Sequence, residues 1–160
     1  MRVLALDVGD KRIGVAVSDP SQVLARSLKV IQRGSRREDF AAVARLVEEY
    51  EVERVVVGYP WSLDGKAHAQ AEKVERYATG LAKALTVPVL LWDERLSTVS
   101  AERLLREAGR RGKKRREKVD AVAAAVILQD YLDSEIQSSK LEVQNSKKEA
   151  RYYEEERLNA

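Results

Sequence analysis

The spacing of hydrophobic residues at the start of the chain predicts β-strands. Residues 3–8 are apolar except for Asp7, and the β-branched residues of 12–18 fall on alternate positions. Alternation places every second side chain on the buried face of a sheet. A Gly-Asp pair between these runs is typical of a hairpin turn. A third strand is expected over residues 25–31, so the chain should open with three adjacent antiparallel strands.

Beyond residue 34 the pattern alternates between helical and strand spacing. The sequence Ser35-Arg36-Arg37-Glu38 fits a capping box, and the apolar residues after it recur at helical intervals. Short Val- and Leu-rich runs predict buried strands. The expected elements are, in order, a helix after residue 35, strand 52–58, helix 67–85, strand 87–92, a helix from 97 or 98 to 108, and helix 119–132.

This order of elements predicts an α/β fold with a five-stranded mixed sheet flanked by helices. A chain of 160 residues matches one domain, which we place at residues 1–132. Residues 133–160 lack sustained periodicity and are rich in Glu, Lys, Ser and Gln. We expect them to form a charged tail, mobile or helical, with a helix docked on a second copy as the alternative.

Composition excludes several classes of chemistry. No apolar run approaches the roughly 20 residues that span a bilayer, so we expect a cytoplasmic protein without membrane contact. The absence of Cys excludes disulfides, thiolate zinc sites and cysteine nucleophiles. The single histidine, His68, is expected on the surface of a helix. The net charge of +3 says little by itself, but residues 110–118 hold seven basic side chains and one acidic one.

Several carboxylates stand where burial makes them costly. Asp7 interrupts an apolar strand, the Asp93-Glu94 pair follows another, and Asp120 lies one helical turn before Ala124. A divalent cation would offset both desolvation and mutual repulsion. Oxygen ligands without His or Cys favour Mg²⁺ or Mn²⁺. The alternative is that each acid acts alone, as a turn former, a helix-start charge or the partner of an arginine.

Four segments, in order, resemble the motifs of the YqgF/RuvX family. They are 7–19 (DVGDKRIGVAVSD), the loop 58–65 with its Gly-Tyr-Pro start, 93–98 (DERLST) and the Lys-Val-Asp run that ends at Asp120. The similarity covers residues 1–132. Ser62 departs from the pattern, because an asparagine is common there in the family, and this puts a substrate contact from that position in doubt.

This resemblance implies a ribonuclease H-like nuclease that processes the 5′ end of pre-16S ribosomal RNA. It also implies that Asp7, one acid of the Asp93-Glu94 pair, and Asp120 gather at one edge of the sheet. There they would hold two divalent ions about 4 Å apart around the scissile phosphate. Alternation along a strand points Asp93 and Glu94 to opposite faces, and the sequence leaves open which of them is the ligand.

Basic residues are expected to contact the nucleic acid. The run at 110–118 would bind phosphates, and Lys11 and Arg12 adjoin the Asp7 turn; the alternative for the run is a solvated loop. Arg95 could bind phosphate or neutralise Asp93. The expected nucleic-acid contacts are Lys11, Arg12, Arg95, Arg110, Arg111, Lys113, Lys114, Arg115, Arg116 and Lys118.

Three other functions compete with RNA processing. A Holliday junction resolvase would act on branched DNA as a homodimer, because a junction presents two symmetric cleavage sites. A non-catalytic nucleic-acid-binding module would keep the fold and its acids without turnover. An actin-like ATPase would need two such domains, and 160 residues supply one. Metal binding through Asp7 and Asp120 would distinguish the nuclease from the binding module.

Overall fold

A computed structural model describes residues 1–60, 65–93 and 121–140 of the chain. Its elements are β1 (Arg2–Val8), β2 (Arg12–Ser18), β3 (Ala25–Gln32), α1 (Arg36–Glu49), β4 (Val52–Tyr59), α2 (Gly65–Ala84) and β5 (Val89–Asp93), followed by a helix over residues 121–140. The helix expected over 97–108 lies outside the described residues.

The strands form one mixed sheet in the order β3-β2-β1-β4-β5. β2 pairs antiparallel with β1 and β3, whereas β4 pairs parallel with β1 and β5. The predicted five-stranded α/β architecture is therefore confirmed. β5 begins at Val89, two residues later than expected, because Pro88 has no N–H for the ladder. The Pro88 carbonyl instead accepts a hydrogen bond from the Val55 amide at 2.9 Å.

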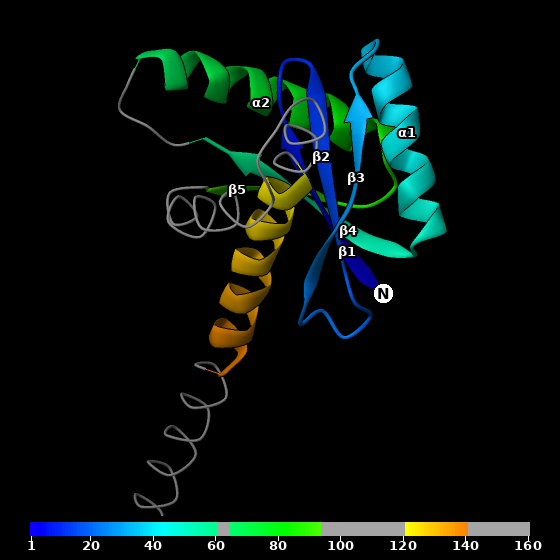
Figure 1. Ribbon diagram of the computed structural model, residues 1–160, viewed down its shortest axis with the longest axis vertical. Helices are drawn as coiled ribbons and strands as arrows, with labels where there is room; N and C mark the ends of the chain where they lie inside the picture. The colour runs from blue at the N-terminus through cyan, green and yellow to red at the C-terminus, as the bar shows by residue number, and fades with distance from the viewer. Residues whose placement is uncertain (61–64, 94–120, 141–160) are drawn as a thin grey trace, which may run out of the picture.

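Helices cover both faces of the sheet, and each face has its own core (Figure 1). Leu4 and Leu6 of β1 point to the face that α1 and α2 cover. Val3 and Ala5, on the alternate positions, pack against the 121–140 helix on the other face. β1 is thus buried on both sides, as expected for the central strand of a three-layer fold.

The 121–140 helix crosses the expected domain end at residue 132 without a break. The sequence spacing predicts that Val122, Ala123, Val126 and Ile127 face inward. Val126 and Ile127 are buried, whereas Val122 and Ala123 are only half-buried. Ala124, Leu128 and Tyr131 join Ile127 in the contact with the sheet. Their spacing of three to four residues makes one continuous stripe that places Tyr131 edge-on against Trp92, with ring centroids 5.4 Å apart.

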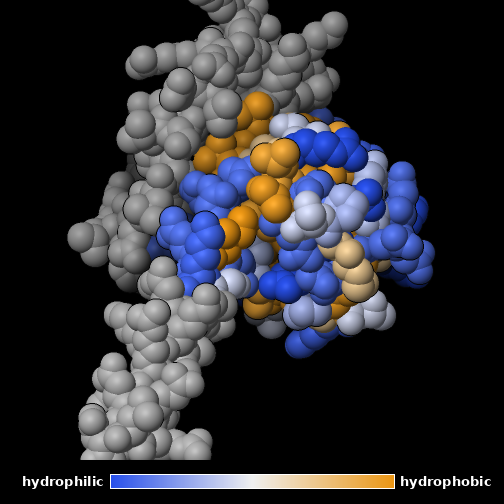
Figure 2. Space-filling model, turned by 90° about the horizontal axis from the view of Figure 1, so that it is seen from below, coloured by the Kyte–Doolittle hydropathy of each residue, from blue (hydrophilic) through white to orange (hydrophobic). Residues whose placement is uncertain are grey.

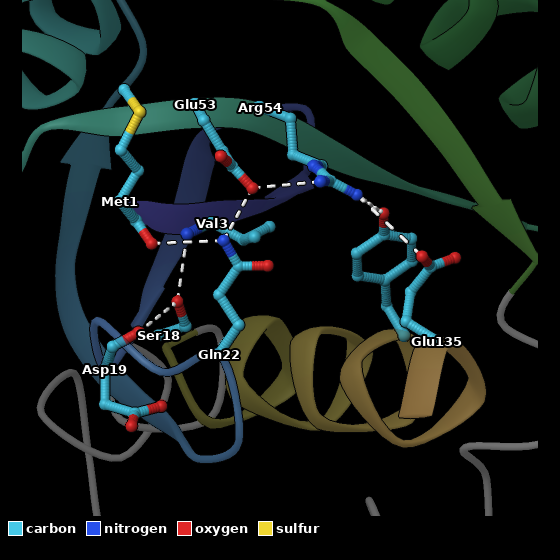
Figure 3. A network of polar contacts seen from close by, with 9 residues as sticks. Met1, Val3, Ser18, Asp19, Gln22, Glu53, Arg54 and Glu135 are labelled. Carbon is cyan, nitrogen blue, oxygen red and sulfur yellow. Dashed lines mark hydrogen bonds and ion pairs between the residues drawn. The ribbon is translucent and has the colours of Figure 1, made fainter. Parts of the chain in front are cut away.

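A polar network holds this helix and the β2–β3 loop at the end of the sheet where β1 begins (Figure 3). Arg54 on β4 donates to the Tyr131 hydroxyl at 2.7 Å and to Glu53 at 2.9 Å. Gln22 in the loop donates to Glu53 and, at 3.1 Å, to the Met1 carbonyl. The hydrogen bond that Gln22 donates to Glu53, and after it the one from Arg54, lowers the pKa of Glu53.

Some hydrophobic side chains reach the surface. Figure 2 shows hydrophobic patches beside hydrophilic ones on the face seen from below. No helix within the described ranges is long and apolar enough to cross a membrane. The large hydrophobic residues exposed in the described part of the chain are Met1, Val23, Leu24, Leu90 and Leu91.

Asp19 organises the β2–β3 loop. Its carboxylate accepts hydrogen bonds from the amides of Val23 at 2.8 Å and Leu24 at 2.9 Å, and from the Ser21 hydroxyl. Gln22 takes a φ of 57° within the loop, and these bonds offset the cost of that conformation. The hydrogen bond from Ser21 is the main cause that lowers the pKa of Asp19 to about 2.

We predict that Asp19 titrates near pH 2 in the folded protein, against an ordinary value of 3.8. The lowered pKa means that the ionised carboxylate stabilises the fold above pH 3.8, and that this contribution is lost as the pH falls through about 2. Carboxyl NMR would follow the titration. Replacement of Ser21 by Ala should move the midpoint upward, and an unchanged midpoint would contradict the assignment.

Candidate active site

Asp7 occupies the next-to-last position of β1 and is half-buried. It shares the parity of Val3 and Ala5, so its side chain lies on the face covered by the 121–140 helix. Its neighbours on both adjacent strands lack side chains: Gly14 pairs with it on β2, and the β1–β4 register continues to Gly58. The carboxylate therefore stands near the end of β1, between two glycine positions of the adjacent strands.

Asp93 lies on the opposite face. It ends β5 in register with Tyr59, one position beyond the Gly58–Trp92 pair. Trp92 packs with the core on the Asp7 face, whereas Tyr59 packs with the core under α1 and α2. Alternation then sets Asp93 on the side of Tyr59, away from Asp7. Asp93 does have an interaction with its surroundings, but it does not share a face with Asp7.

The turn after Asp7 is tightly closed. The Gly9 amide donates to the Arg12 carbonyl at 2.9 Å. A Cβ on Gly9 would lie 2.9 Å from the same carbonyl oxygen, closer than real Cβ contacts come, so only glycine fits without a backbone shift. Lys11 is exposed in this turn and Arg12 is half-buried. These two of the expected phosphate contacts therefore lie at the β1–β2 turn, beside the end of β1 that carries Asp7.

Arg33, which sequence reasoning did not identify, fastens this turn from the β3–α1 junction. Its backbone amide donates to the Lys11 carbonyl at 3.0 Å, and its Nη1 donates to the Gly9 carbonyl at 3.0 Å. One residue thus holds both ends of the turn that follows the Asp7 strand. A lone arginine after a strand carries no sequence signal for this role, because the contact depends on how β3 pairs with β2 beside the turn.

Asp39 in turn holds Arg33. Its carboxylate is 1% exposed and accepts hydrogen bonds from Arg33 Nε at 3.4 Å, the Gly34 amide at 3.0 Å and the Tyr77 hydroxyl at 3.3 Å. Burial, and after it the charge of Asp39, raises the pKa of Tyr77 above its ordinary value, so the hydroxyl remains a donor. An acid in the first turn of α1 is ordinary, but its burial required the tertiary structure.

The remaining expected site residues fall outside the described part of the chain. Within the described ranges no three acidic, His or Cys side chains come together as a metal site. Of the four expected acids, the structure describes Asp7 and Asp93. Outside them lie Glu94, Arg95, Asp120, Arg110, Arg111, Lys113, Lys114, Arg115, Arg116 and Lys118.

Comparison with known proteins identifies the family. A model of the family described as "RuvX: Holliday junction resolvase" matches residues 1–134. A protein of Thermoanaerobacter pseudethanolicus, named as a candidate pre-16S rRNA nuclease, is 46% identical over 136 residues, which are 84% of this chain and 98% of that protein. A protein of Caldanaerobacter subterraneus with the same name is 48% identical over 136 residues, with the same coverage.

Among solved structures, T. thermophilus RuvC in complex with a Holliday junction substrate has a TM-score of 0.54 at 16% identity. The similarity covers 86% of this chain and 96% of that one, and at this identity it shows a shared fold alone. Fold and sequence relatives together define a nuclease of the ribonuclease H-like class. The chain belongs to the RuvX family.

We predict that Asp39→Ala lowers the free energy of unfolding by about 2–4 kcal/mol, because it leaves Arg33, Tyr77 and the Gly34 amide without their common acceptor. Urea denaturation would measure the loss. Asp39→Asn keeps an acceptor for Gly34 and should cost less. Faster hydrogen exchange at Gly9 and Arg33 should accompany the Ala variant, and unchanged exchange would contradict the role of Asp39 in holding the turn.

Proposed function

We propose that this protein hydrolyses phosphodiester bonds of precursor 16S ribosomal RNA with Mg²⁺ or Mn²⁺ held by Asp7, Glu94 and Asp120. The observation that carries the proposal is the position of Asp7. A half-buried carboxylate stands at the sheet edge between two glycines, in a chain whose relatives are named as candidate nucleases of this RNA.

The register of β5 supports Glu94, rather than Asp93, as the second ligand. Asp93 lies on the α1 and α2 face with Tyr59, whereas Asp7 lies on the other. If the strand alternation continued by one residue beyond Asp93, Glu94 would take the face of Asp7. This argument favours Glu94 over Asp93 as the ligand of the proposed metal site.

The direction of the 121–140 helix supports Asp120 as the third ligand. The helix begins beside β3, where the Ser27 hydroxyl donates to the Ala121 carbonyl at 3.1 Å. Further along, Tyr131 contacts Arg54 near the start of β4. Because β1 and β4 run parallel, the helix starts toward the Asp7 end of the sheet. Asp120 directly precedes this start in sequence and comes four residues before Ala124, which packs against the sheet.

This donor set fits a hard divalent cation. Every proposed ligand is a carboxylate, and the chain has no Cys and a single His, so the chemistry favours Mg²⁺ or Mn²⁺ over zinc. When bound, such cations lower the pKa of water and stabilise charge on phosphoryl oxygens. The chain itself would position the ligands through the fixed turn after Asp7, and Lys11, Arg12, Arg95 and the basic run at 110–118 would bind the flanking phosphates.

We predict that Asp7→Asn reduces cleavage of a precursor 16S RNA fragment by about 10²–10³-fold or more, because the neutral amide no longer balances the charge of the cation. Gel assays with Mg²⁺ or Mn²⁺ would measure the rate, and calorimetric Mn²⁺ titration should show weaker binding. The fold should persist, with thermal unfolding close to that of the wild type. An active Asp7→Asn protein would disprove the proposal.

We predict that Glu94→Gln matches Asp7→Asn in lost Mn²⁺ affinity and lost cleavage, while Asp93→Asn retains both within about tenfold. The two variants remove the same charge at adjacent positions, so each is the control for the other. The reverse ranking would assign the ligand to Asp93 and contradict the argument from strand parity.

The family description also names resolution of Holliday junctions, so the assays should include a synthetic four-way junction. We prefer RNA as the substrate because the relatives at 46% and 48% identity are named as candidate pre-16S rRNA nucleases. Symmetric cleavage of a junction requires two active sites and hence a homodimer. Efficient cutting of the junction by a dimer, without cutting of the RNA, would replace the RNA substrate with branched DNA.

A further inference from the structure

A second site lies on the opposite face of the sheet from the Asp7 carboxylate. A cavity of about 220 Å³ opens where the β1–β2 turn, the start of α1 and the middle of α2 meet. Figure 1 shows these elements converging at the upper end of the molecule. We call it the basic pocket. Its charged lining residues are Asp10, Arg33, Arg36, Lys73 and Arg76, and Gln70 and Tyr77 complete the polar lining.

Arg33 is the fixed element of the basic pocket. Its Nε and Nη1 are held by Asp39 and the Gly9 carbonyl, and its guanidinium carbon lies 5.0 Å from the centre of the Tyr77 ring. Neither of these hydrogen bonds uses Nη2. A guanidinium held in one plane loses little conformational entropy when it binds an oxyanion. The structure thus holds one donor group ready before any ligand arrives.

The other cations of the pocket are exposed and weakly engaged. Lys73 lies 3.8 Å from Asp10, and Arg76 lies 3.5 Å from Glu72 on the preceding turn of α2. Exposed ion pairs of this kind contribute about 0–1 kcal/mol, so both cations can turn toward a ligand. Arg36 is exposed at the first position of α1, where the helix dipole adds positive potential.

We propose that the basic pocket binds a backbone phosphate of the nucleic-acid substrate, other than the scissile one. The wall of the pocket includes Val8 and Asp10, the residues on either side of Gly9 at the end of β1. A nucleic-acid strand bound at Asp7 can therefore reach the pocket across the β1–β2 turn. The cavity is smaller than the roughly 300–1,000 Å³ that encloses a drug-sized ligand. It therefore suits a phosphate of a continuing strand better than a whole nucleotide.

This inference rests on the proposed function for its substrate class, but its test does not depend on cleavage. The variant Arg36→Gln, Lys73→Gln and Arg76→Gln removes three exposed charges from the pocket. The control Lys29→Gln, Arg45→Gln and Lys83→Gln removes three exposed charges elsewhere. Fluorescence anisotropy with labelled single-stranded RNA in EDTA measures binding without metal. Thermal unfolding of both variants should match that of the wild type, because none of the replaced side chains is buried.

We expect the pocket variant to bind RNA about tenfold more weakly than the control at 0.1 M salt. The slope of log K against log salt should fall by about 0.7 relative to the control, as for one lost contact to single-stranded nucleic acid. Equal affinity and slope in the two variants would overturn the proposal, whether or not the wild type cleaves RNA. Conversely, the expected loss of binding in a protein that fails to cleave would uphold the pocket and reject the nuclease activity.

A parallel titration with inorganic phosphate and with adenosine monophosphate distinguishes a strand phosphate from a free ligand. We expect neither to bind at micromolar concentration, because a single phosphate lacks the contacts that the rest of the strand supplies. Micromolar binding of either compound, lost in the pocket variant while RNA affinity stays at the control level, would make the basic pocket a small-molecule site and contradict the proposal.

Discussion

Burial of β1 on both faces is the constraint on which the rest of the structure depends. A strand in the middle of a three-layer fold must divide its side chains strictly between two cores. In β1 the even positions Leu4 and Leu6 serve one core, and the odd positions Val3 and Ala5 serve the other. Asp7 is the next odd residue, so its carboxylate is placed on the face of the 121–140 helix. The same parity separates Asp7 from Asp93.

Rigidity at this edge comes from a short chain of polar contacts rather than from the acid itself. Asp39 holds Arg33, and Arg33 holds the Gly9 and Lys11 carbonyls of the turn that follows Asp7. A buried pair of this kind contributes little net stability, but it is costly to break from one side. Its value here is positional, because it fixes the turn that follows Asp7, the ligand of the proposed metal site. The same arginine also lines the basic pocket, so one side chain connects the turn after Asp7 with this pocket.

The end of the sheet where β1 and β4 begin, which we call the far end, is held together differently. There Arg54, Glu53 and Gln22 join β4, the β2–β3 loop and the 121–140 helix through exposed and half-buried hydrogen bonds. The Asp7 end is dominated by cations and glycines, whereas the far end is closed by its own hydrogen bonds. Under the proposed function, substrate binding lies at the Asp7 end of these strands, and the hydrogen bonds at the other end close the fold.

The sequence by itself determined the elements, their order and the family. The periodicity of hydrophobic residues is a local property of the sequence. The alternation over 12–18, the helical spacing after Ser35 and the unusual place of Asp7 in an apolar strand could therefore be recognised from the sequence alone. Only the tertiary structure decided which residues meet. Strand register separated Asp93 from Asp7, and packing added Ala124 and Leu128 to the predicted Ile127 on the inward face of the 121–140 helix. The junction of β3 with α1 brought Arg33 to the turn. Such contacts join positions far apart in the chain, where no local pattern specifies the pairing.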